Sequence, residues 1–483
     1  MSARSAPPAA RRWWALALIA AAQFMVIMDT SIIGVALPRI QEDLGFSQEN
    51  LSWVFNAYVV AFGGLLLLGG RLSDLLGARR LFSAGWAVLL AGSAVAGAAG
   101  TVPVELTGRA LQGVGAALIA PAALTLLMML FGSEPRELTK ALALYGAAAP
   151  AGGTAGVFLG GVITEYVSWP WVFYINIPIA VLALAAAPAL MPGGRGGARG
   201  SVDVIGALTV TAGLGAIVFA VVRAPEVGWD AGATWAVLAG GLVLLGVFLA
   251  VQASRRVPLM PLSIFRAPNL GAANLAQLLL GGAWIPMWFF LNLYLQQVLG
   301  YSAFPSGAAL VPMTALIMLG MIVLAPRTLG RLGPKRSIVA GLLVLAAGMG
   351  WLSLIRPDGD YWVDVLPASL VAALGMSLAF IPSLGTALSA ARPEEGGLAS
   401  GIVNTSYQVG SALGLAAMTA IAASSGAGRL GDLPALTDGF SAAFVGAALI
   451  ALAGAVLAAV TLRTPRPAST SVPEAEHEKA PSH

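Results

Sequence analysis

Long apolar runs recur along the whole chain, and they restrict it to a fold that is embedded in a membrane. A helix needs about 20 consecutive apolar residues to cross a bilayer, and runs of this length are separated here by short polar segments. Hydrophobic residues make up 58% of the 483 residues and charged residues only 10%, whereas a soluble domain carries about 25% charged residues. The sequence therefore predicts an all-α protein that crosses the membrane many times.

Charge-free apolar runs bounded by polar residues give fourteen candidate spans. Sequence patterns place each boundary to within about 2–4 residues. The spans are 13–37, 51–70, 81–100, 103–128, 141–163, 170–191, 203–222, 232–253, 269–298, 305–326, 337–355, 364–386, 396–423 and 439–462.

The positions of Lys and Arg test this count. With the N-terminus in the cytoplasm, 21 of the 26 basic residues lie in cytoplasmic segments and four in outer loops. The remaining one, Arg109, lies inside the fourth span. Cytoplasmic loops of membrane proteins carry an excess of Lys and Arg, and omitting one span would invert every later loop. We therefore expect an even number of spans with both termini in the cytoplasm, as in a multi-pass protein of the plasma membrane.

Several kinds of chemistry are excluded by composition. The chain has no Cys, and its two histidines, His477 and His483, lie in the polar tail. Disulfides and thiolate metal sites are therefore excluded, and no G-x-x-x-x-G-K-[ST] phosphate loop is present. We expect no cofactor, no metal and no nucleic-acid partner, because the basic pI follows from the cytoplasmic loops. Energy for pumping would come from an ion gradient or from a separate protein.

The two ends of the chain add little. The first apolar run, which follows Arg4, Arg11 and Arg12, is longer than the 7–15 residues of a signal-peptide core. We interpret it as a retained span. The segment 463–483 is rich in Pro, Ser and Glu and is predicted to be a disordered cytoplasmic tail.

Two loops resemble each other and indicate an internal duplication. Gly70–Arg80 (GRLSDLLGARR) follows the second span, and Pro326–Arg336 (PRTLGRLGPKR) follows the tenth. Both end in a basic pair and carry matching glycines, Gly77 and Gly333. Duplicated halves are common in transporters. The predicted organisation is a six-helix half (13–191), two inserted helices (203–253) and a second six-helix half (269–462).

With these features the chain resembles the major facilitator superfamily, specifically its fourteen-span drug:proton antiporter branch. The resemblance covers nearly the whole chain and rests on seven local patterns in order: Met28 to Pro38 (MDTSIIGVALP); Gly70, Leu72, Asp74, Gly77 and Arg79; Arg109, Gln112, Gly113 and Gly115; Gly152, Gly156, Gly160 and Gly161; Ser168 to Pro178 (SWPWVFYINIP); Leu293 to Ser302 (LYLQQVLGYS); and Ser400 to Gly414 (SGIVNTSYQVGSALG). The sequence departs from the branch at Val157, Pro170 and Gly330, where Pro, Arg and Asp are expected.

Asp29 and Arg109 are the charges that lie well inside predicted spans. At 1.5 Å per residue both lie at similar depth, about 12 Å and about 8 Å from the outer side. An intramembrane acid suggests function. A nearby guanidinium stabilises its charged form, whereas apolar surroundings favour the protonated form. We interpret the pair as the proton-coupling site, with a static ion pair as the alternative. Glu105, one turn from Arg109, is either a second proton acceptor or interfacial, and we favour the interfacial position.

The loop after the second span fits a cytoplasmic gate formed by Gly70, Asp74, Gly77, Arg79 and Arg80. Asp74 can accept hydrogen bonds from a helix N-terminus, and Gly77 permits a tight turn. The alternative is a simple basic anchor. In the fifth span, Gly152, Gly156, Gly160 and Gly161 allow close helix approach, either for pure packing or for a sliding helix where the halves meet.

A binding cavity is expected to combine aromatic and a few polar side chains. The candidates are Gln23, Trp53, Asn56, Tyr58, Gln112, Asn274, Gln277, Trp284, Asn292, Asn404, Tyr407 and Gln408. Together they suggest an apolar cavity for lipophilic, neutral or cationic compounds.

The resemblance implies a bacterial multidrug-efflux antiporter: protons enter and lipophilic drugs or toxic metabolites leave, which gives antibiotic resistance. We expect a monomer that is not an enzyme. A lipid or lipid-precursor exporter on the same fold is the main alternative. A membrane sensor or enzyme is a third reading, disfavoured by the absence of signalling domains and of catalytic clusters.

Overall fold

The computed structural model describes residues 9–46, 53–193, 203–228, 231–255, 258, 260–392, 395–429 and 431–463. Within these ranges every regular element is a helix and no strand occurs, which confirms the predicted all-α class. From residue 464 onward the predicted tail lies outside the described residues.

A first group of helices covers the first six predicted spans: α1 (Ala9–Leu44), α2 (Trp53–Leu76), α3 (Ala78–Gly97), α4 (Val102–Phe131), α5 (Pro135–Tyr166), α6 (Trp171–Tyr174) and α7 (Asn176–Leu190). Inside this group α1 packs against α5, and α4 packs against both α2 and α3. The sixth predicted span is divided between α6 and α7, because the chain leaves the α-helical hydrogen-bonding pattern at Ile175.

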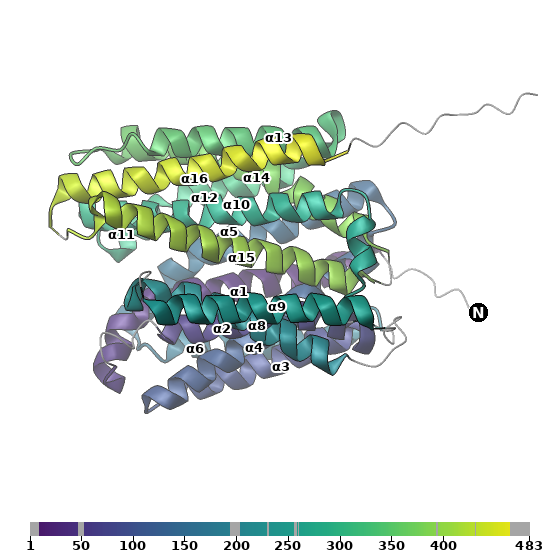
Figure 1. The fold of residues 1–483 in the computed structure, drawn as a ribbon. Helices are drawn as coiled ribbons and strands as arrows, with labels where there is room; N and C mark the ends of the chain where they lie inside the picture. Colours follow the sequence, from purple (N-terminus) through teal and green to yellow (C-terminus); the bar gives the residue numbers. More distant parts are fainter. Residues whose placement is uncertain are drawn as a thin grey trace, which may run out of the picture.

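A second group covers the last six predicted spans: α10 (Leu270–Leu293), η2 (Tyr294–Val298), α11 (Ala303–Ala309), α12 (Val311–Leu319), η3 (Gly320–Leu324), α13 (Ala325–Leu352), η4 (Tyr361–Val365), α14 (Leu366–Ala390), α15 (Gly396–Ala422), η6 (Ala423–Ala427) and α16 (Leu433–Thr461). The two groups meet where α5 contacts α12 and α14, and where α2 contacts α15. Figure 1 shows the first group below and the second above, with α5 near the boundary.

Two further helices, α8 (Val204–Val227) and α9 (Gly232–Ser254), lie in front of this boundary in Figure 1. α8 packs against α2 and α15, and α9 packs against α8. Close approach is possible because a Cβ at Gly64 of α2 would lie only 3.3 Å from the backbone of Gly215. The short helix η1 (Leu262–Arg266) connects α9 to the second group.

The duplicated loops have the same backbone conformation at their matching glycines. Gly77 has φ 95° and precedes α3, and Gly333 has φ 74° and divides α13 into two straight parts. Positive φ is readily adopted only by glycine. The similarity between the two loops is therefore structural as well as sequential.

Twelve helical segments of the described chain are long and apolar enough to cross a membrane. One of them, Phe304–Leu352, has 49 residues and contains the break at Gly333. A shorter apolar helix, Ile205–Ala220, lies in α8. The predicted multi-pass membrane character is thus confirmed.

Candidate functional site

The buried ion pair predicted from helix depth is present. Nη1 of Arg109 on α4 lies 2.8 Å from Oδ2 of Asp29 on α1. The two side chains are 0% and 1% exposed. Both helices are apolar along most of their length, so the pair is surrounded by packed hydrocarbon rather than by solvent.

Asp29 is held as an ionised carboxylate by its neighbours. Its Oδ1 accepts hydrogen bonds from Nε2 of Gln112 at 3.0 Å and from Nδ2 of Asn176 at 2.7 Å. The amide of Gln112 can be oriented only in this way, because its Oε1 accepts from Arg109, which has no acceptor atom. Ser93 accepts from both amides and completes the ring. With three donors and no acceptor against it, the carboxylate carries its charge.

Arg109 is fixed by two further contacts. Its Nε donates to the backbone carbonyl of Val54 at 2.8 Å. The ring of Tyr58 lies 4.8 Å from the guanidinium carbon and that of Phe173 lies 5.9 Å away, within the range of cation–π attraction. Its Nη2 is buried without a hydrogen-bond partner among the described residues.

Glu105 is not at a solvent-exposed interface, and the interfacial position favoured by the sequence is wrong in this respect. The side chain is 0% exposed. Neither of its carboxyl oxygens has a hydrogen-bond partner in the described part of the chain. It lies in the first turn of α4, where the packing of α4 against α3 and α2 extends nearly to the helix end.

The predicted gate residues connect the two groups of helices. Oδ1 of Asp74 accepts from the backbone N–H of Gly397 at 2.7 Å, and Oδ2 accepts from that of Leu398 at 2.9 Å. These are free N–H groups of the first turn of α15, where negative charge is stabilised. Gly70 allows the approach, since a Cβ there would lie 3.0 Å from Cα of Gly401. Arg79 contacts the carbonyl of Pro188 instead, and Arg80 is exposed.

Three of the four motif glycines of α5 face α1 rather than the second group of helices. A Cβ at Gly156 would lie 2.8 Å from the carbonyl oxygen of Met28, and one at Gly160 would lie 2.7 Å from that of Ile32. Gly152 faces the backbone of Phe24 in the same way, whereas Gly161 has open space around it. The spacing of four residues therefore brings α5 onto the part of α1 that carries Asp29.

The twelve predicted cavity residues lie in different places. Tyr58 and Gln112 belong to the ion-pair site, and Gln277 and Tyr407 both contact Phe380 of α14. Asn274 is bonded to Ser406 of α15. The other seven lie elsewhere along the bundle: Gln23, Trp53, Asn56, Trp284, Asn292, Asn404 and Gln408.

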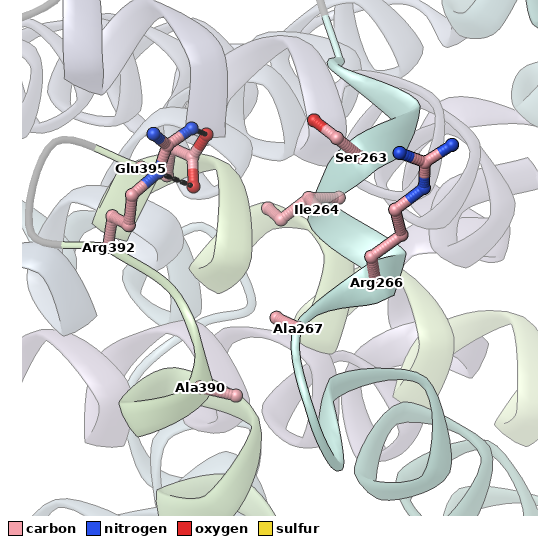
Figure 2. A pocket seen from close by; sticks show the side chains of 7 residues that line it. All are labelled: Ser263, Ile264, Arg266, Ala267, Ala390, Arg392 and Glu395. Atoms are coloured by element: carbon pink, nitrogen blue, oxygen red, sulfur yellow. Dashed lines mark hydrogen bonds and ion pairs between the residues drawn. The ribbon is translucent and has the colours of Figure 1, made fainter.

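Two hollows stand out, and none of the twelve residues lines either. The first, shown in Figure 2, lies between η1 and the end of α14 and contains the exposed pair of Arg392 and Glu395. The second is apolar and is lined by side chains of α2, α8, α9, α10 and α15. One common cavity for the twelve residues stays a prediction. No group of three metal-ligating side chains gathers within the described ranges.

Asn176 and Ser93 were not among the predicted site residues. Asn176 belongs to the segment Ser168–Pro178, whose sequence pattern was recognised, and this was the available signal. Ser93 gave none, because a serine in an apolar helix bonds to its own backbone in many proteins.

Known proteins share this sequence and fold. The sequence model of the Major Facilitator Superfamily matches residues 19–415. The chain is 40% identical over 449 residues to the cephamycin export protein CmcT of Amycolatopsis lactamdurans, with 92% of each chain covered. It is 38% identical over 475 residues to the puromycin resistance protein pur8 of Streptomyces alboniger, with 95% of this chain and 93% of the relative covered.

Solved structures support the same fold. The structure of the human organic anion transporter MFSD10 (TETRAN) has a TM-score of 0.65 at 15% identity and covers 94% of this chain and 100% of its own. FucP in its outward conformation has a TM-score of 0.64 at 14% identity, again over 94% and 100% of the two chains.

Proposed function

The chain belongs to the major facilitator superfamily, and we propose that it is a proton-coupled antiporter that exports antibiotic-like, lipophilic small molecules across the plasma membrane. It is a transporter and not an enzyme. The observation that carries the proposal is the buried pair of Asp29 and Arg109, and the names of the relatives support antibiotics as the substrate class. Efflux of puromycin from intact cells, stopped by a protonophore, tests the proposal. Altered envelope lipid without puromycin efflux would favour the lipid-export alternative.

Coupling follows from the two environments that the carboxylate of Asp29 can have. In this structure it faces three hydrogen-bond donors and is charged. If the two groups of helices move and Arg109 is drawn away, burial favours the protonated form. The site can accept that form, because Oδ1 of Asn176 is buried without a partner among the described residues. By turning its amide over, Asn176 would accept the new O–H of Asp29.

The contact of Asp74 with α15 would hold one side of the transporter closed. It joins α2 of the first half to α15 of the second half with two charge-assisted hydrogen bonds. Because Gly70, Gly397 and Gly401 bring the two backbones together, the carboxylate reaches the helix end directly. Breaking these bonds would open the cytoplasmic side.

Asp74→Asn is expected to slow export about tenfold without reducing expression. The amide offers one acceptor atom in place of two and has no charge, and a hydrogen bond to a charged group contributes about 1.5–3 kcal/mol. The initial rate of efflux at equal protein level measures the effect. Glu134→Gln, which changes an exposed acid in the loop before α5, is the matched control. Equal rates for Asp74→Asn and wild type would contradict the gate.

The described helices support fourteen crossings. The 49-residue segment Phe304–Leu352 becomes two spans when it is divided at Gly333, and α8 provides one more. Both termini would then lie in the cytoplasm, and the first and second six-helix halves would flank α8 and α9.

Because the chain has no Cys, single cysteines can test this arrangement. We expect a membrane-impermeant thiol reagent added to intact cells to label Gly232→Cys, before α9, and not Ser254→Cys, at its other end. Both positions are exposed. Equal labelling of the two would show that α9 does not cross.

A further inference from the structure

We propose that Glu105 is a second proton-carrying acid and that Arg109 is shared between Glu105 and Asp29, so that one proton and one guanidinium exchange places. This rests on the proposed function, because it describes how the proton of that antiport reaches Asp29. The observation behind it is a fully buried acid that the ion pair does not use.

Glu105 carries a proton in this structure. Its side chain is 0% exposed, and both carboxyl oxygens lack a partner in the described part of the chain. An ionised carboxylate in that position would be strongly unfavourable. A role as a helix-capping charge does not explain it, because a cap would accept hydrogen bonds from the first-turn N–H groups, and no such bond is present among the described residues.

Asp29 is in the opposite state. Three donors surround its carboxylate, one of them charged. The three buried ionisable groups Asp29, Glu105 and Arg109 therefore have one negative charge, one positive charge and one proton. The phenol of Tyr58, which faces Arg109, donates to the backbone carbonyl of Val26 and leaves this balance unchanged.

Arg109 is placed to serve both acids. It follows Glu105 by four residues on α4, and side chains at this spacing are neighbours on one helix face. Only Nη1 and Nε are engaged, while Nη2 is buried without a partner in the described residues. A rotation of the guanidinium toward Glu105 would give Nη2 a carboxylate without removing the charge from the apolar interior.

The exchange balances in atoms and charge. The O–H bond of Glu105 breaks, the proton binds an Oδ atom of Asp29, and the guanidinium moves from Asp29 to the newly ionised Glu105. The cluster has no net charge before and after. Glu105 lies one turn, about 6 Å, nearer the α4 end at Val102 than Arg109 does. In the proposed orientation that end is the outer one, so a proton entering from outside meets Glu105 first.

Infrared spectroscopy of the purified, reconstituted protein tests the protonation state without any substrate. At neutral pH we expect a carbonyl band of a protonated carboxyl group in the wild type, and its loss in Glu105→Gln. This variant keeps the shape and the neutrality of the protonated acid, so it should fold. Glu165→Gln, at an exposed acid of α5, should keep the band. An identical band in Glu105→Gln and wild type would overturn the proposal.

A second variant tests the sharing of Arg109. In Asp29→Asn the guanidinium has no acidic partner except Glu105, so the band should disappear. Persistence of the band would show that Arg109 does not move to Glu105 and would overturn the exchange. Melting temperatures add a check: the double variant Asp29→Asn/Glu105→Gln should lose more than the sum of the single losses. If puromycin efflux proved independent of the proton gradient while the bands behaved as expected, the antiport would fail and the protonation of Glu105 would stand.

Discussion

Asp29→Asn is expected to abolish export driven by a pH gradient while leaving a folded protein that still binds its substrate. The amide cannot release or take up the proton, so the gradient no longer biases the direction of transport. With one proton per substrate, each unit of pH difference supplies about 1.4 kcal/mol, a tenfold difference in substrate accumulation that the variant loses. Puromycin efflux at imposed pH gradients, with puromycin binding measured on the purified protein, separates the two effects.

The fold should survive this substitution. Removing one member of a buried ion pair ordinarily costs about 3–5 kcal/mol, because the other charge is left alone. Here Glu105 is within one helical turn of Arg109 and can provide the missing negative charge. Glu165→Gln serves as the control for removal of an acid at the membrane. Gradient-driven efflux of normal size in Asp29→Asn would mean that another group carries the proton.

Contact between Asp29 and Arg109 could be predicted because depth along a helix follows directly from residue number. The helical rise fixes how far each side chain lies from the membrane surface, and few charges were available to meet. The rotation of a helix about its axis is not fixed in this way. That is why Asn176 and Ser93, which face the same carboxylate, were not found, and why twelve predicted cavity residues lie in several places.

The gate illustrates the same distinction. Asp74 was expected to accept hydrogen bonds from a helix N-terminus, because a carboxylate in a short glycine-containing loop has few other stable partners. Its partners, Gly397 and Leu398, lie more than 300 residues away in sequence, and only the packing of α2 on α15 identifies them. For Glu105, one turn from a helix end, sequence could not distinguish burial from exposure, because that depends on how far α3 and α2 extend beside it.

Gly156→Ala is expected to destabilise the protein and to stop export, because α5 and α1 are in backbone contact at this position. The added Cβ would lie 2.8 Å from the carbonyl oxygen of Met28 and 3.0 Å from the backbone nitrogen of Ile32. Neither atom is a flexible side chain that can turn away. Overpacking of this kind costs about 1–3 kcal/mol, and the relief available is displacement of the part of α1 that carries Asp29.

The matched control is Gly161→Ala on the same helix, where the added Cβ meets no atom within 4 Å. Both substitutions raise helix propensity equally, so a difference between them reports the contact with α1. We expect a lower melting temperature and no puromycin efflux for Gly156→Ala, and wild-type values for Gly161→Ala. If Gly156→Ala kept full stability but lost efflux, the motif would serve motion of α5 along α1 rather than packing. If it kept both, the approach of the two helices would not matter to the proton site.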